Sequence, residues 1–112
     1  MEIAEKAVDD ISILGISGRL DAKSSKTVES ALNNLINGGR TKIVVDLASV
    51  EYISSVGLRV LLASLKKMSQ TQSLLILSSM QPFVKDIFKV AGFDRLFTVC
   101  ATPEEALSKA RA

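Results

Sequence analysis

Apolar runs of two kinds alternate along this chain, and their order limits the folds that it can adopt. Residues 43–45 and 74–77 are continuously apolar, whereas residues 28–36 and 58–68 carry Val, Leu, Ile or Met at helical spacing. A strand that is apolar on both faces is covered on both faces, which is typical of the parallel sheets of α/β proteins. The sequence therefore predicts an α/β domain.

The predicted element order is β-β-α-β-α-β-α-β-α, with a mixed sheet of four or five strands and about four helices. A chain of 112 residues is of ordinary size for one domain, so we expect a single domain over residues 1–112. Strands are expected at residues 2–8, 11–17, 43–47, 73–79 and 95–99, with Gly18 ending the second strand. Helices are expected after an N-cap at Asp21, from Ser55, from Pro82, and after a capping box at Thr102 and Glu105.

The residues that the chain lacks exclude several classes of function. There is no histidine and a single cysteine, Cys100, so neither a histidine-based catalytic triad nor an internal disulfide is possible. The chain has no glycine-rich phosphate loop, and its net charge of +2 is too small to indicate a binder of nucleic acid or membrane surfaces. We expect no enzymatic activity, no catalytic residue and no cofactor.

The sequence also gives expectations about metals and location. Asp21, Asp46 and Asp94 could meet at strand ends and hold a divalent cation, but each also suits a cap or turn, and we expect no metal site. No apolar run approaches the ~20 residues of a membrane span, and the acidic N-terminus lacks the apolar core of a secretory signal. We therefore expect a soluble cytoplasmic protein.

The stretch "EYISSVGLRV", residues 51–60, joins a strand-like run to a helix-like run and holds the candidate site. Ser54 suits the N-cap, with its oxygen reaching the amide of Gly57, and Ser55 is then the first helical residue. A glycine in a first turn indicates that something approaches the backbone closely. A phosphate on Ser55 would meet free amides and the positive end of the helix dipole, whereas a docked partner would have to accommodate its charge. The same residues also permit a simpler interpretation, in which both serines only cap the helix.

The longer stretch "IVVDLASVEYISSVGLRVLL" resembles the signature of the STAS domain, and specifically that of the bacterial anti-sigma-factor antagonists. The resemblance covers essentially the whole chain, including its length and element order. The residues that match the signature are Asp46, Leu47, Ile53, Ser55, Gly57 and Leu58, and upstream Gly18, Leu20 and Asp21.

The resemblance implies a phosphorylation-controlled binding switch. Its partners would be an anti-sigma factor that is also a serine kinase and a serine phosphatase of the PP2C type, with no direct contact to nucleic acid or membrane and a monomer or weak dimer as the working state. Ser55 would accept the phosphate, Asp21 and Asp46 would flank the partner surface, and Gly57 would permit close approach. The implied partner-binding residues are Asp21, Asp46, Ser54, Ser55, Val56, Gly57 and Arg59.

Two positions depart from the family pattern. Ser54 stands where the family often has aspartate, which leaves Ser54 as the alternative acceptor. Arg59 stands where a small residue is common, and it could tune the choice of partner or simply be a solvated helix residue.

Two other functions remain open at this point. The chain could be a non-switching STAS scaffold or partner module within a larger transport, secretion or signalling complex. It could also be an enzyme or small-ligand binder, although the missing histidine and phosphate loop disfavour this class.

Overall fold

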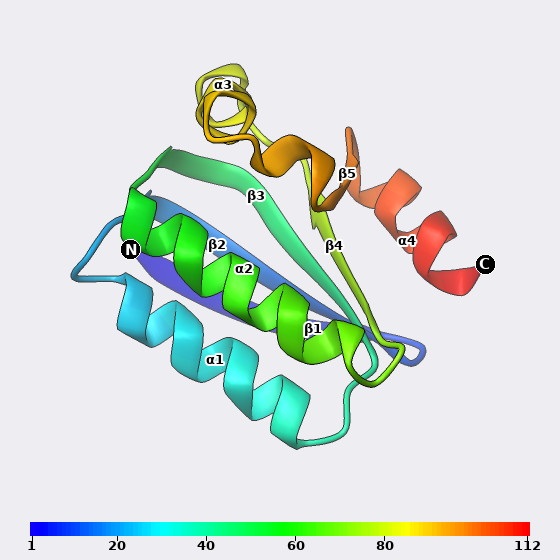
Figure 1. The fold of residues 1–112 in the computed structure, drawn as a ribbon. Coiled ribbons are helices and arrows are strands. Elements are labelled where there is room, and N and C mark those ends of the chain that lie inside the picture. The colour runs from blue at the N-terminus through cyan, green and yellow to red at the C-terminus, as the bar shows by residue number, and fades with distance from the viewer.

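A five-stranded mixed sheet forms the centre of the protein in a computed structural model that describes all 112 residues (Figure 1). The strands lie in the sheet in their order along the chain. β1 pairs antiparallel with β2, and every later pair is parallel. The strands are β1 (Glu2–Val8), β2 (Ile11–Leu20), β3 (Lys42–Ile53), β4 (Leu74–Ser78) and β5 (Thr98–Cys100). The predicted fold class and element order are confirmed.

Four helices cover the two faces of the sheet. They are α1 (Ser25–Asn37), α2 (Ser55–Ser69), α3 (Pro82–Val90) and α4 (Pro103–Arg111), with a short 3₁₀ helix at Phe93–Arg95. Helices α1 and α2 lie side by side on one face, and α3 adds Val84 and Phe88 to the core beneath them (Figure 1). Helix α4 packs Ala106 and Ala110 on the other face.

The continuous apolar run in β3 follows from this double cover. Ile43, Val45 and Leu47 belong to the core under α1 and α2, whereas Val44 belongs to the core under α4. Successive side chains of a strand point to opposite faces, so a strand covered on both sides needs apolar residues at consecutive positions. The prediction of a central, doubly covered strand is confirmed.

Two strands are longer than the sequence predicts. β2 does not end at Gly18, because this glycine adopts a φ of +96° at an irregularity of the ladder, and the strand continues to Leu20. β3 does not end at residue 47 but runs to Ile53, and its second half pairs only with the last residues of β2, from Ser17 to Leu20. The segment 48–53, expected as a loop, is therefore strand.

The last strand is shifted along the chain relative to its predicted range of 95–99. Gly92 has a φ of +76° and starts the 3₁₀ helix, which takes up Arg95, so β5 begins only at Thr98. The cap of α4 is confirmed, because Thr102 Oγ1 accepts a hydrogen bond from the amide of Glu105 at 3.1 Å. The carboxylate of Glu105 accepts from the amide of Ala101 at 3.0 Å, one residue before the position usual in a capping box.

Candidate functional site

The start of α2 is held against the end of β2 by Ser54. The side chain of Ser54 accepts a hydrogen bond from the amide of Gly57 at 3.2 Å, which confirms it as the N-cap. Its own amide donates to the carbonyl oxygen of Leu20 at 2.9 Å. Its backbone is extended, with φ −89° and ψ 171°, as expected of an N-cap residue. Both the side chain and the backbone amide of Ser54 are thus engaged in hydrogen bonds within the fold.

Ser55 is the first residue of α2 and is exposed to solvent. The next residue, Val56, is a large apolar side chain that is 38% exposed. Arg59 is also exposed, one turn further along the helix. The first turn of α2 contains no acidic residue, so its free amides and the positive end of its dipole carry no compensating charge.

Gly57 is buried, and the close approach expected there is internal. A Cβ atom at this position would lie 2.8 Å from Leu20 Cγ, 2.9 Å from the Leu20 carbonyl oxygen and 3.0 Å from Ile53 Cγ1. The missing side chain thus lets α2 begin directly against the ends of β2 and β3. Its contact with a partner stays a prediction beside this packing role.

Asp21 lies at the same edge of the sheet, directly after Leu20. Its carboxylate accepts from the amides of Lys23 and Ser24, each at 3.1 Å. Helix α1 begins only at Ser25, so the expectation that Asp21 is its N-cap is wrong. The reason is local: the Ser24 hydroxyl accepts from the Asp21 amide at 2.9 Å, and this reciprocal pairing forms a separate turn before the helix.

The hydrogen bond from the Ser24 amide is the main cause of a lowered pKa for the Asp21 carboxyl. A carboxyl with a lowered folded-state pKa stabilises the fold above its unfolded pKa, and this contribution disappears as the pH falls through the folded value. We therefore expect Asp21→Asn to lower the free energy of unfolding at pH 7, and the difference from wild type to be smaller at pH 3, below the ordinary aspartate pKa of ~3.9. Urea unfolding at both pH values measures it, and a difference that is equally large at the lower pH would contradict the assigned cause.

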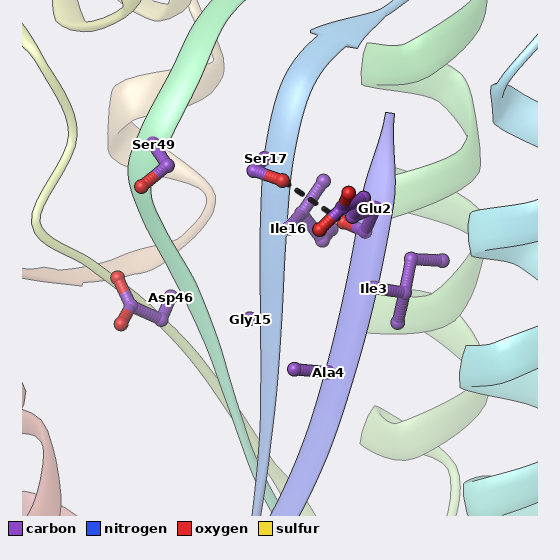
Figure 2. Close-up of a pocket in the computed structure, with 8 residues that line it drawn as sticks. All are labelled: Glu2, Ile3, Ala4, Gly15, Ile16, Ser17, Asp46 and Ser49. Carbon is purple, nitrogen blue, oxygen red and sulfur yellow. Dashed lines mark hydrogen bonds between the residues drawn. The ribbon is translucent and has the colours of Figure 1, made fainter.

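Asp46 lies away from the start of α2, so its contact with a partner stays a prediction. Because β3 continues for seven residues beyond Asp46 to Ile53, extended geometry separates the two by about 20 Å. Asp46 instead lines a shallow hollow of about 230 Å³ on the face of the sheet away from α1 and α2 (Figure 2). The hollow is lined by Glu2, Ile3, Ala4, Gly15, Ile16, Ser17, Asp46 and Ser49.

Three residues that the sequence analysis missed lie at the ends of β2, β3 and the start of α3. The guanidinium carbon of Arg19 lies 4.4 Å from the ring centroid of Tyr52. The Tyr52 ring stacks on Phe83, with 6.5 Å between centroids and an interplanar angle of 28°. Phe83 is 58% exposed, so the stack is open to solvent. The sequence does not indicate this cluster, because β3 was expected to end at residue 47. Only the longer strand pairs Tyr52 with Arg19.

No group of three or more carboxylate or cysteine side chains lies close enough to hold a metal ion, so Asp21, Asp46 and Asp94 do not come together. None of the helices combines the length and the apolar character that a membrane span requires.

Comparison with known proteins identifies the family to which this fold belongs. The sequence profile of the STAS domain matches residues 2–106, which is nearly the entire chain. The protein belongs to the STAS domain family. A candidate anti-sigma factor antagonist of Bordetella bronchiseptica, BtrV, is 31% identical over 95% of this STAS domain and 91% of its own length. The anti-sigma-F factor antagonist RsfB of Mycobacterium tuberculosis is 28% identical over 90% and 82%, respectively.

A solved structure gives the same result for the fold of the STAS domain. The crystal structure of a candidate anti-sigma factor antagonist from Thermotoga maritima superposes with a TM-score of 0.93 at 27% identity, covering 98% of this chain and 95% of that one. The relatives belong to a non-enzymatic family, which agrees with the expectation that this chain is not an enzyme.

The cap of this STAS domain can be tested by removing the Ser54 hydroxyl. We expect Ser54→Ala to lower the free energy of unfolding by about 1 kcal/mol and Tm by about 4–8 °C, because the Gly57 amide loses its acceptor. Ser55→Ala is the matched control and should leave Tm nearly unchanged, since its exposed hydroxyl does not cap the helix. Thermal unfolding followed by circular dichroism measures both, and equal shifts for the two variants would contradict the assignment of the cap.

Proposed function

We propose that this STAS domain is an anti-sigma factor antagonist whose binding ends when Ser55 is phosphorylated. The observation that carries the proposal is the different position of the two serines at the start of α2. Ser54 caps the helix through its side chain, whereas Ser55 beside it is exposed. The naming of its relatives as anti-sigma factor antagonists supports the class of partner.

The proposal favours Ser55 over Ser54 as the acceptor for a physical reason. A kinase must bring the γ-phosphoryl group of ATP in line with a serine oxygen that it can reach. Ser54 is half-buried and its Oγ accepts from the Gly57 amide, so a phosphate there would replace the cap. Ser55 Oγ can be approached from solvent without changing that hydrogen bond.

The added group would act on the partner rather than on the fold. A phosphate carries about −1.5 to −2 charge at pH 7, and a helix N-terminus stabilises such an anion. The residue beside Ser55 offers an apolar contact, because the Val56 side chain is exposed. A partner that covers this surface would have to desolvate the phosphate, which costs binding energy.

The switch needs two further proteins. A serine kinase, which we propose is the anti-sigma factor itself, transfers the γ-phosphoryl group of ATP to Ser55 Oγ and releases ADP and a proton. A serine phosphatase, proposed to be of the PP2C type, returns the free hydroxyl by hydrolysis and releases inorganic phosphate. We propose that this cycle takes place in the cytoplasm, with the antagonist as a monomer or weak dimer.

A kinase reaction tests the proposal directly. The anti-sigma factor recovered with the wild-type protein, supplied with ATP, should add one phosphate that tandem mass spectrometry maps to Ser55. We expect Ser55→Ala to receive none and Ser54→Ala to receive it still. Phosphate on Ser54 in both wild type and Ser55→Ala would move the assignment to Ser54, and a recovered partner without kinase activity would favour a non-switching STAS module.

A further inference from the structure

We infer that Arg59 binds the phosphate of phosphorylated Ser55 within the same helix, and that this pairing removes the guanidinium from the partner surface. The inference rests on the proposed function in so far as Ser55 is the modified residue. It gives a role to an exposed arginine in the second turn of α2.

The geometry of α2 places the two side chains together. Ser55 and Arg59 are separated by four positions of a continuous helix, and both are exposed. Side chains at this spacing lie on one face of a helix, and the Cα–Cβ bonds tilt toward the N-terminus. The long side chain of Arg59 therefore extends toward Ser55. An anion placed four residues before a cation is also the more favourable order of such a pair.

Arg59 has no carboxylate partner in the unmodified protein. The chain contains two ion pairs, Lys42–Asp10 and Arg111–Asp9, and neither involves Arg59. Its neighbours at three and four positions along α2 are uncharged: Ser55, Val56, Leu62 and Ala63. A phosphate on Ser55 would be the first anion placed within reach of this guanidinium on the helix surface.

The pair has a defined chemistry. A guanidinium donates parallel N–H groups that fit two phosphate oxygens at once, and such charge-assisted bonds are roughly twice as strong as neutral ones. The pairing favours the dianionic phosphate and therefore lowers its second pKa. Before phosphorylation Arg59 is free to meet an acidic group of the partner, and afterwards it is paired internally. Phosphorylation would thus add a negative charge and withdraw a positive one.

The second pKa of the phosphate measures the contact. Phosphoserine can be installed at position 55 by genetic encoding, so the experiment does not depend on any kinase, and ³¹P NMR follows its titration. We expect Arg59→Ala to raise this pKa by about 0.2–0.4 unit, as an i,i+4 ion pair implies, and Arg59→Lys to raise it less. Alanine favours helix, and Arg59 is exposed, so α2 should remain folded in this variant.

Two controls isolate the pair. Lys66→Ala removes an exposed cation that lies about 16 Å from Ser55 along the helix axis. This variant should leave the pKa of the phosphate at position 55 unchanged. Phosphoserine encoded at position 54, which lies outside the helix, should titrate identically with Arg59 and with Arg59→Ala. A pKa at position 55 that is the same in wild type and Arg59→Ala would overturn the inference. This result would leave the acceptor assignment intact, because that assignment is decided separately by the mapped product of the kinase reaction.

Discussion

Ser55→Asp is expected to fold as stably as the wild-type protein and to bind the anti-sigma factor about 30- to 1,000-fold more weakly, a loss of about 2–4 kcal/mol. An acidic side chain in the first turn of a helix interacts favourably with the dipole, so the substitution should not lower the stability of the fold. The partner, however, would have to bury a carboxylate beside Val56, which is apolar and exposed. Thermal unfolding and calorimetric titration with the recovered partner measure the two parts separately.

The matched control is the same charge placed one residue earlier. Aspartate is as good an N-cap as serine, so Ser54→Asp keeps the hydrogen bond with the Gly57 amide and adds the same negative charge. We expect this variant to bind within a few-fold of wild type, since the carboxylate is held by the Gly57 amide and Ser55 stays unmodified. Equal weakening by both variants would mean that net charge, and not the position of Ser55, governs binding. Full-strength binding by Ser55→Asp would contradict the proposed action of the phosphate.

Gly57→Ala is expected to lower the free energy of unfolding by about 2 kcal/mol and Tm by about 10 °C. Elsewhere in a helix this substitution stabilises by up to about 1 kcal/mol, because alanine is the better helix former. Here the new methyl group would lie 2.9 Å from the carbonyl oxygen of Leu20, a backbone atom that also holds the Ser54 amide. The start of α2 must then move away from β2, and the steric cost exceeds the gain in helix propensity.

Gly15→Ala provides the comparison for this prediction. A Cβ atom on Gly15 would meet only the carbonyl oxygen of Ala4, at an ordinary contact distance of 3.7 Å. Its φ lies outside the left-handed region, so alanine can adopt the same backbone without strain. We expect this variant to unfold within about 1 kcal/mol of wild type, in either direction. If Gly57→Ala proved as stable as Gly15→Ala, the close packing of α2 on β2 would not be what requires the glycine.

The parts of the fold that the sequence predicts are those determined by local patterns. The unbroken apolar run at Ile43–Val45 requires cover on both faces of its strand, and the structure supplies it from α2 and α4. The caps at Ser54 and Thr102 depend on hydrogen bonds over three residues, so their spacing alone locates the helix starts. Such features need no knowledge of distant contacts.

The parts that the sequence did not predict depend on pairing between distant segments. β3 extends to Ile53 only because β2 continues past Gly18 beside it, and this extension moves Asp46 away from the candidate site. The same extension pairs Tyr52 with Arg19. The sequence indicates a close approach at Gly57, but the approaching residue within the fold is Leu20, which is 37 positions earlier in the chain.

The most direct test of the switch compares two fractions of the protein taken from cells. Affinity-tagged protein is separated by size into the fraction bound to the anti-sigma factor and the free fraction, and intact phosphopeptide mapping gives the occupancy of Ser55 in each. The account predicts a bound fraction with Ser55 unmodified and a free fraction in which phosphate on Ser55 is concentrated. Equal occupancy of Ser55 in the two fractions, or phosphate confined to Ser54, would contradict it.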